Sequence, residues 1–157
     1  MSRAFVNEEA AEASAAILPE RAISPRPNLV TPSGSRLIDE HIAQLQASLA
    51  GSGPEDESRP RLIRDLRYWR ARRATAQVVE SPLRAPREVA FGTTVTVRRG
   101  STALRYRIVG EDEADPAKGL LSRASPLAEA LQGARPGETV EVGGDRPSVT
   151  VERIDAG

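Results

Sequence analysis

The chain has 157 residues, no cysteine, one histidine, and 22 basic against 22 acidic side chains, so its formal net charge is zero. This composition excludes a disulfide scaffold, a thiolate metal site, a cysteine nucleophile and a metal cluster built from histidines. The length leaves room for one domain or two very small ones, and the balanced bulk charge gives no reason to expect a polyanion partner.

The N-terminal stretch, residues 1–30, is rich in alanine and glutamate and then in proline. Because it has few large apolar residues, it cannot bury enough surface to offset the entropy lost on ordering, and we predict a flexible extension. A docking peptide is the alternative, and residues 8–16 can form a transient helix. Glutamates stand where a signal peptide would be apolar, and no apolar run reaches about 20 residues, so we expect a cytoplasmic protein with no membrane partner.

A first helix is predicted over residues 31–50. Thr31 suits the N-cap and Pro32 the first helical position, while two glycines and Pro54 prevent continuation beyond residue 50. Apolar residues repeat at spacings of 4, 3 and 4, which is typical of a narrow coiled-coil seam; they are Ile38, Ile42, Leu45 and Leu49.

A second helix is predicted from about residue 59 to residue 79. Its seam repeats at spacings of 4, 3, 4 and 3 and comprises Leu62, Leu66, Trp69, Arg73 and Ala76. Two seams of similar length, joined by a short loop, favour an antiparallel coiled-coil hairpin over residues 31–80.

Residues 89–157, after a linker at 81–88, are predicted to form a β-rich domain. Valines alternate with threonines over 94–97, and apolar residues alternate with arginines over 104–108, as in strands with one buried face. A short helix is expected to begin at Ser125-Pro126, and paired valines near 140 and 150 complete the expected antiparallel sheet. The fold class is therefore α+β.

Several motifs resemble the bacterial transcript cleavage factors GreA and GreB. In chain order they are LVTPSG (29–34), DLRYWRARRATAQVV (65–79), FGTTVTV (91–97), IVGEDEADPAKG (108–119), SPLAEAL (125–131) and GETVEV (137–142). The resemblance implies an FKBP-like C-terminal domain that binds RNA polymerase core enzyme at the rim of its secondary channel, with the coiled coil directed toward the catalytic centre. It also implies an accessory factor that is not an enzyme, has no cofactor of its own, and acts on the Mg²⁺ of polymerase. We expect a monomer.

The loop between the helices carries three acidic residues, Glu55, Asp56 and Glu57. Carboxylates at such a tip could help hold the second metal of a two-metal hydrolysis site. The family's tip motif is absent, however, and the arm is shorter than in GreA or GreB. Helix capping and solvation are therefore the second interpretation, since negative charge is favoured before a helix N-terminus.

Seven arginines but only one acid lie between residues 59 and 73. On a helical wheel Arg61, Arg64 and Arg72 share an outer face with Tyr68, which favours contact with RNA phosphates or an acidic channel wall. An ordinary solvated helix face is the alternative. A separate acidic cluster at 111–115 suggests a cation site, but its spacing does not match an EF-hand loop, and a solvated turn is favoured.

Ser125, Pro126 and Leu127 are the predicted polymerase docking residues, because the resemblance places this strand–helix junction at the contact. Their alternative role is only to begin the short helix. Three functions stay open: a Gre-family elongation regulator that can promote cleavage of backtracked RNA, a short-armed non-cleaving regulator that competes with GreA and GreB as nucleoside diphosphate kinase regulators do, and an FKBP-like prolyl isomerase. The third is disfavoured, because the β domain has only Phe91 and Tyr106 as aromatic residues.

Overall fold

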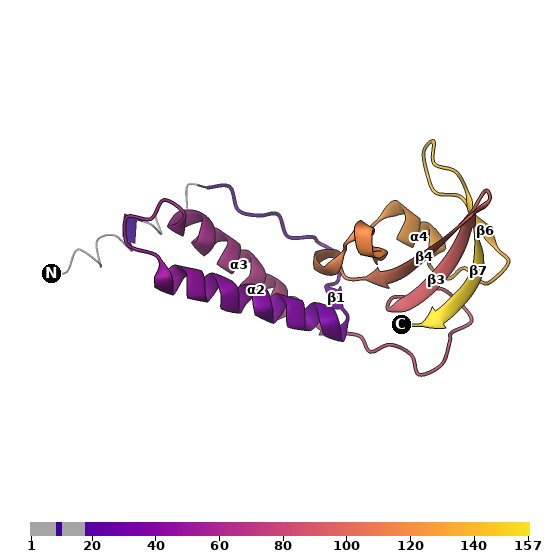
Figure 1. Ribbon diagram of the computed structural model, residues 1–157, viewed down its shortest axis with the longest axis horizontal. Helices are drawn as coiled ribbons and strands as arrows, with labels where there is room; N and C mark the ends of the chain where they lie inside the picture. Colours follow the sequence, from indigo (N-terminus) through magenta and orange to yellow (C-terminus); the bar gives the residue numbers. More distant parts are fainter. Residues whose placement is uncertain (1–8, 11–17) are drawn as a thin grey trace. The chain divides into compact units, whose positions relative to one another are not determined.

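The computed structural model describes residues 9–10 and 18–157, and it has a mixed α+β fold (Figure 1). The chain divides into two compact units. The helical unit comprises the residues up to Asn28 together with Ser35–Ala76, and the sheet unit comprises Leu29–Gly34 together with Gln77–Gly157. Residues 29–34, predicted as part of the extension and the hairpin, thus group with the sheet. Most of the transient helix predicted over 8–16 lies outside the described residues.

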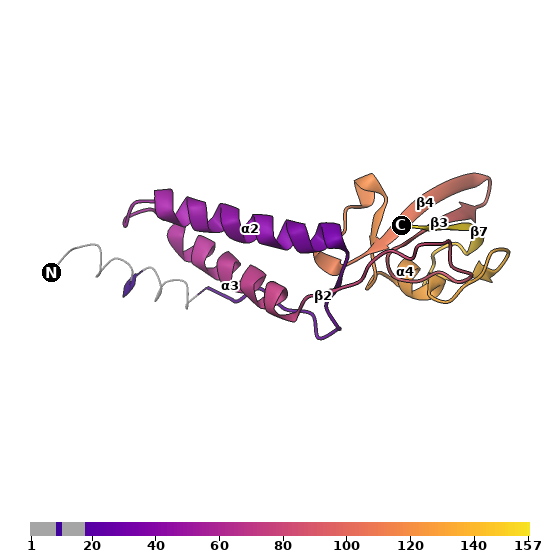
Figure 2. The same cartoon turned by 90° about the horizontal axis from the view of Figure 1, so that it is seen from below.

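Two helices, α2 (Pro32–Gly51) and α3 (Arg59–Thr75), lie side by side and are joined by residues 52–58 (Figure 2). The N-terminus of α2 is capped as predicted, because the backbone N–H of Gly34 donates to Thr31 Oγ1 over 3.0 Å. Pro32 takes the first helical position.

The interior between α2 and α3 is narrow. Ile38 and Ile42 on one helix and Leu66 and Trp69 on the other are buried. His41 stacks on the Trp69 indole with ring centroids 4.1 Å apart and planes 7° from parallel. This stack lets a polar ring share the seam, because its flat face makes the apolar contact.

The predicted second helix is wrong at its C-terminal end. It stops at Thr75 rather than Val79, and residues 77–78 form strand β2 (Gln77–Val78). In the sheet unit β2 pairs in parallel with β1 (Leu29–Val30). The backbone groups of residues 77–78 thus bond to a segment 48 positions earlier, which local helix patterns cannot reveal.

Near the C-terminal end of α3, the buried face is also displaced by one residue from the predicted seam. Arg72, predicted on the outer face, is only 2% exposed, whereas Arg73, predicted in the seam, is exposed and pairs with Asp39 over 3.1 Å. The buried guanidinium of Arg72 donates to Asn28 Oδ1 over 2.7 Å. A buried charge is tolerable only with such hydrogen bonds, so Asn28 explains why an arginine can face inward here.

The sheet unit contains a five-stranded sheet in the order β5-β4-β3-β7-β6. Its strands are β3 (Thr93–Arg99), β4 (Thr102–Val109), β5 (Leu120–Ser122), β6 (Thr139–Val140) and β7 (Val149–Ala156). Neighbours are antiparallel except β5, which runs parallel to β4, so the prediction of a fully antiparallel sheet is wrong at this edge. The β3–β7 register shifts between Thr96 and Val97, as at a β-bulge.

Helix α4 (Pro126–Leu131) covers the sheet and completes the core of this unit. Alternate residues of β3 and β7 point inward, as the sequence pattern predicted. The buried apolar core consists of Val89, Val95, Val97, Ile108, Ala128, Leu131, Ala134, Val142, Val149, Val151 and Ile154.

The acidic segment 111–115 is not simply a solvated turn. Glu113, in the 3₁₀-helix η1 (Glu111–Glu113), accepts the Thr31 hydroxyl at 2.6 Å and 2.7 Å through its two carboxylate oxygens. A Cβ at Gly34 would lie 2.6 Å from Glu113 Oε2, so a larger residue there would displace the Glu113 carboxylate. Asp115 caps the next 3₁₀-helix, η2 (Pro116–Lys118), by accepting from the Ala117 N–H.

Within the described residues, no helix has the length and apolar character needed to cross a membrane.

Removal of the Asn28 side chain should destabilise the helical unit. Asn28→Ala deletes an acceptor from buried Arg72 and a donor from its carbonyl oxygen, so we expect the free energy of unfolding to fall by about 1–3 kcal/mol. Urea denaturation followed by circular dichroism measures this change. Arg70→Ala, at an exposed position of α3, is the matched control and should change it by less than about 0.5 kcal/mol. Equal losses in the two variants would contradict the assigned role of Asn28.

Candidate functional site

The loop between α2 and α3 presents the three predicted carboxylates to solvent. Glu55, Asp56 and Glu57 are all exposed. Asp56 turns back on its own chain, because Oδ1 accepts from the Ser58 N–H at 2.9 Å and from the Ser58 hydroxyl at 2.7 Å. The three predicted residues are therefore adjacent but not equivalent: one shapes the loop, and the other two project from it.

The hydrogen bonds from Ser58, hydroxyl first and then backbone N–H, lower the pKa of Asp56 below its ordinary value of 3.8, with a further contribution from the charge of Arg59. Both donors favour the charged carboxylate. Asp56 therefore acts as a turn-forming residue that leads the chain into α3, in line with the capping interpretation.

Arg59 fastens the other side of the loop, a role that the sequence analysis missed. Its Nη1 donates to the Leu49 carbonyl oxygen at 3.1 Å and to the Ser52 hydroxyl at 2.8 Å. A positive charge is favoured at the C-terminus of a helix, where carbonyl groups lack partners, so Arg59 caps α2 from the first residue of α3. The sequence does contain a signal for this role, because a basic residue, Arg59, follows shortly after the glycines that end α2.

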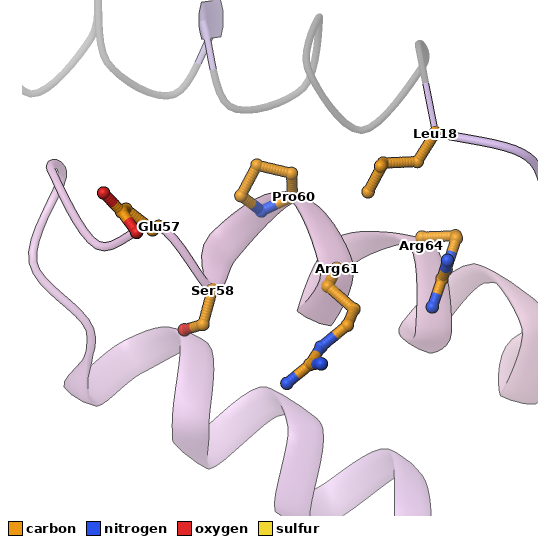
Figure 3. Close-up of a pocket in the computed structure, with 6 residues that line it drawn as sticks. All are labelled: Leu18, Glu57, Ser58, Pro60, Arg61 and Arg64. Carbon is orange, nitrogen blue, oxygen red and sulfur yellow. The ribbon is translucent and has the colours of Figure 1, made fainter.

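A hollow of about 490 Å³ opens beside this loop at the start of α3 (Figure 3). Two predicted residues of the basic face, Arg61 and Arg64, line it together with the predicted tip residue Glu57. Its complete lining is Leu18, Glu57, Ser58, Pro60, Arg61 and Arg64. The hollow thus combines apolar walls with charges of both signs. Among the described residues, no three His, Cys, Asp or Glu side chains are grouped so that they could hold a metal ion.

The three arginines of the predicted basic face differ in exposure. Arg61 is exposed, and Arg64 is half-buried with its Nη2 3.0 Å from Asp65 Oδ1. Arg72 does not belong to this face, because it is buried against Asn28. The helical wheel placed Arg72 outward because the predicted seam ran through Arg73, whereas the structure buries Arg72 and exposes Arg73.

Residues 18–28, which we call the strap, run along α3 in the helical unit (Figure 2). Glu20 accepts from Arg67 Nη2 at 2.6 Å, and the Arg21 guanidinium lies 3.9 Å from the centroid of the Tyr68 ring. The sequence analysis missed this segment, because its few large apolar residues predicted a flexible extension.

The predicted docking residues lie together at the start of α4 in the sheet unit. The Ser125 hydroxyl accepts the Ala128 N–H at 3.2 Å, Pro126 is exposed at the first helical position, and Leu127 packs partly against the core. The N-cap interpretation of Ser125 and Pro126 is thus confirmed. It leaves Pro126 as the residue of the three that is available to a partner.

Comparison with known protein families matches residues 84–155, which include α4 and all of the five-stranded sheet except the last residue of β7, to the family described as "Transcription elongation factor, GreA/GreB, C-term". Over these residues, slightly less than half of the chain, the sequence is similar to the C-terminal domain of the GreA/GreB family. The match covers the predicted docking residues but not the loop, the hollow or the strap.

Two relatives illustrate the extent of this similarity. The chain is 38% identical over 91 residues to the transcription elongation factor GreA of Desulfovibrio desulfuricans, in an alignment that covers 57% of this chain and 56% of the relative. It is 48% identical over 67 residues to that of Pseudomonas putida, with 41% of each chain covered. The chain therefore spans about half the length, or less, of the curated relatives it matches.

Among solved structures, GreA factor homolog 1 of Thermus thermophilus aligns over 83% of this chain and 100% of its own, with 16% sequence identity and a TM-score of 0.39.

The Asp56 turn has a testable dependence on pH. Its folded-state pKa lies below 3.8, so its stabilising contribution is fully present above that value and is lost as the pH falls through the lower folded-state pKa. Ser58→Ala removes the hydroxyl donor, and the Asp56 titration midpoint should rise toward 3.8, as measured by NMR of the carboxyl carbon. Ser48→Ala, on the exposed part of α2, should leave the midpoint unchanged. The same midpoint in all three proteins would refute the assigned cause.

Proposed function

We propose that this protein is a GreA/GreB-type transcription elongation factor that binds RNA polymerase core enzyme. The observation that carries the proposal is the family match over residues 84–155, supported by relatives named transcription elongation factor GreA. The protein would act in the cytoplasm as a monomeric accessory factor, with no catalytic residues and no cofactor of its own.

Within this proposal the sheet unit is an FKBP-like docking domain, and the two helices form a short antiparallel coiled coil that enters the secondary channel. Pro126 supports the docking role, because it is exposed beside a core-packed leucine on a helix of only six residues. Such a rigid, capped turn can present a small apolar contact at little entropic cost.

The loop carboxylates define what the factor can do at the polymerase active site. Carboxylate oxygens are the ligands that Mg²⁺ prefers, so Glu55 and Glu57 have suitable chemistry to assist a metal ion bound by polymerase. Asp56 is less suitable, because Oδ1 already accepts two hydrogen bonds from Ser58.

A non-cleaving role is therefore the form of the proposal that we favour. If Asp56 keeps its turn, two glutamates on a short exposed loop remain, and extra carboxylates increase metal occupancy only when they are held in position. The protein would then occupy the channel and compete with cleavage factors of the same family.

Pro126→Glu tests the docking surface. Glutamate is tolerated in the first turn of a helix, so α4 should persist, while a charge at the contact should weaken binding to core RNA polymerase by about tenfold or more. Biolayer interferometry with immobilised polymerase measures the affinity. Ala103→Glu adds the same charge at an exposed position of β4 and should bind like the wild type. Wild-type protein that fails to bind polymerase would overturn the whole proposal.

RNA cleavage in backtracked complexes tests the role of the loop. We expect at most weak cleavage when the protein is added alone, and a progressive loss of GreA-stimulated cleavage when it is added as competitor. The triple variant Glu55→Ala, Asp56→Ala, Glu57→Ala should compete equally well, because docking lies elsewhere. Robust cleavage that disappears in the triple variant would establish metal assistance instead.

A further inference from the structure

The strap covers the part of α3 that carries arginine and tyrosine side chains. Glu20 pairs with Arg67, and Arg21 lies over Tyr68 while its Nη1 is 3.8 Å from Asp65 Oδ1. Arg21 also lies 5.6 Å from the centroid of the Trp69 ring. The strap therefore occupies an anion-binding arginine and the face of an aromatic ring at the same time.

The two ends of the strap are held very differently. At its C-terminal end Asn28 is 4% exposed and its Nδ2 donates to the Arg72 carbonyl oxygen at 2.7 Å and to the Thr75 hydroxyl at 3.2 Å. At the other end the side chains of Glu20 and Arg67 are 58% and 40% exposed. Solvent-exposed ion pairs contribute little and are screened by salt, so residues 18–21 can lift while Asn28 stays bound.

The prolines of the strap reduce the conformational entropy that is lost when it binds α3. Pro19, Pro25 and Pro27 restrict the backbone of the strap in any state, so little conformational entropy is lost when it lies along α3. A segment that loses little conformational entropy on binding, and that is weakly held at one end, exchanges readily between bound and released states.

Single-stranded RNA has the chemistry to replace the strap on this face. A phosphate oxygen can take the place of the Glu20 carboxylate on Arg67, and a base can stack on Tyr68 where the Arg21 guanidinium now lies. Arg61, exposed one to two turns earlier on α3, remains accessible while the strap is in place and provides a first contact.

We propose that residues 18–28 are an autoinhibitory strap that competes with single-stranded RNA for the surface formed by Arg67 and Tyr68. The inference rests on the proposed function, which brings α3 close to nascent RNA. It adds a regulatory role for the N-terminal extension: RNA binds this face only when the outer end of the strap is released.

The test uses the full chain and a fluorescently labelled oligouridine. The double variant Glu20→Gln, Arg21→Gln keeps the net charge of the protein and leaves the Asn28 anchor intact. If the strap is closed about 90% of the time in the wild type, its release should lower the apparent Kd for the oligouridine about tenfold. Fluorescence anisotropy at fixed salt gives both affinities.

Arg98→Gln, Glu152→Gln is the matched control, because it also removes an exposed ion pair without a change of net charge, on β3 and β7. Its affinity for the oligouridine should equal that of the wild type. Trp69, the single tryptophan, reports release independently. Its emission should change when oligouridine is added to the wild type, and the double variant should show the changed emission before any RNA is added.

The outcomes separate this inference from the proposed function. Changed Trp69 emission in the double variant with no gain in RNA affinity would overturn the strap's competition with RNA. Absence of oligouridine binding in every variant would overturn it as well. Neither result touches the proposed function, which depends on polymerase binding by wild-type protein. The inference would be supported if the Glu20→Gln, Arg21→Gln variant binds RNA more tightly than both the wild type and the control variant.

Discussion

The buried guanidinium of Arg72 is the constraint on which the helical unit depends. A guanidinium stays charged at any physiological pH, so its burial requires hydrogen-bond acceptors in fixed positions. Asn28 supplies one of them and returns a hydrogen bond to the carbonyl oxygen of the same arginine. This reciprocal pair ties the end of the strap to the last turns of α3. The Asn28–Arg72 hydrogen bonds thus determine the course of the strap and the face of α3 that it covers. They also determine which residue of α3 lies in the inner seam.

Local signals in the sequence were enough for most of the fold. Thr31 and Pro32 define the start of α2, and Ser125 and Pro126 define the start of α4. Alternation over residues 94–97 predicts β3, because each of these signals acts within a few residues. Errors arose where partners are distant. The end of α3 depends on strand pairing with residues 29–30, and β5 is three residues long and is defined only by its parallel neighbour.

The candidate site shows the same division. The exposed carboxylates at 55–57 and the exposed Arg61 follow from the loop and from the helical period. Arg72 was misplaced because its partner lies 44 residues away, and no periodic pattern reports a single buried hydrogen bond. Glu113 and the strap were missed as partners for a related reason: acidic and proline-rich segments are usually solvated, and only the folded chain brings them to Thr31 and to α3.

The strand order of the sheet has a consequence for how this protein is made. The central strand β3 lies between β4, its immediate successor, and β7, which begins at Val149. While the ribosome extends the chain, the β3 edge of the β3–β4 hairpin therefore stays unpaired for about 40 residues before β7 emerges. An unpaired edge invites wrong pairing between nascent chains. Synthesis speed across residues 110–148 thus sets how long that hazard lasts.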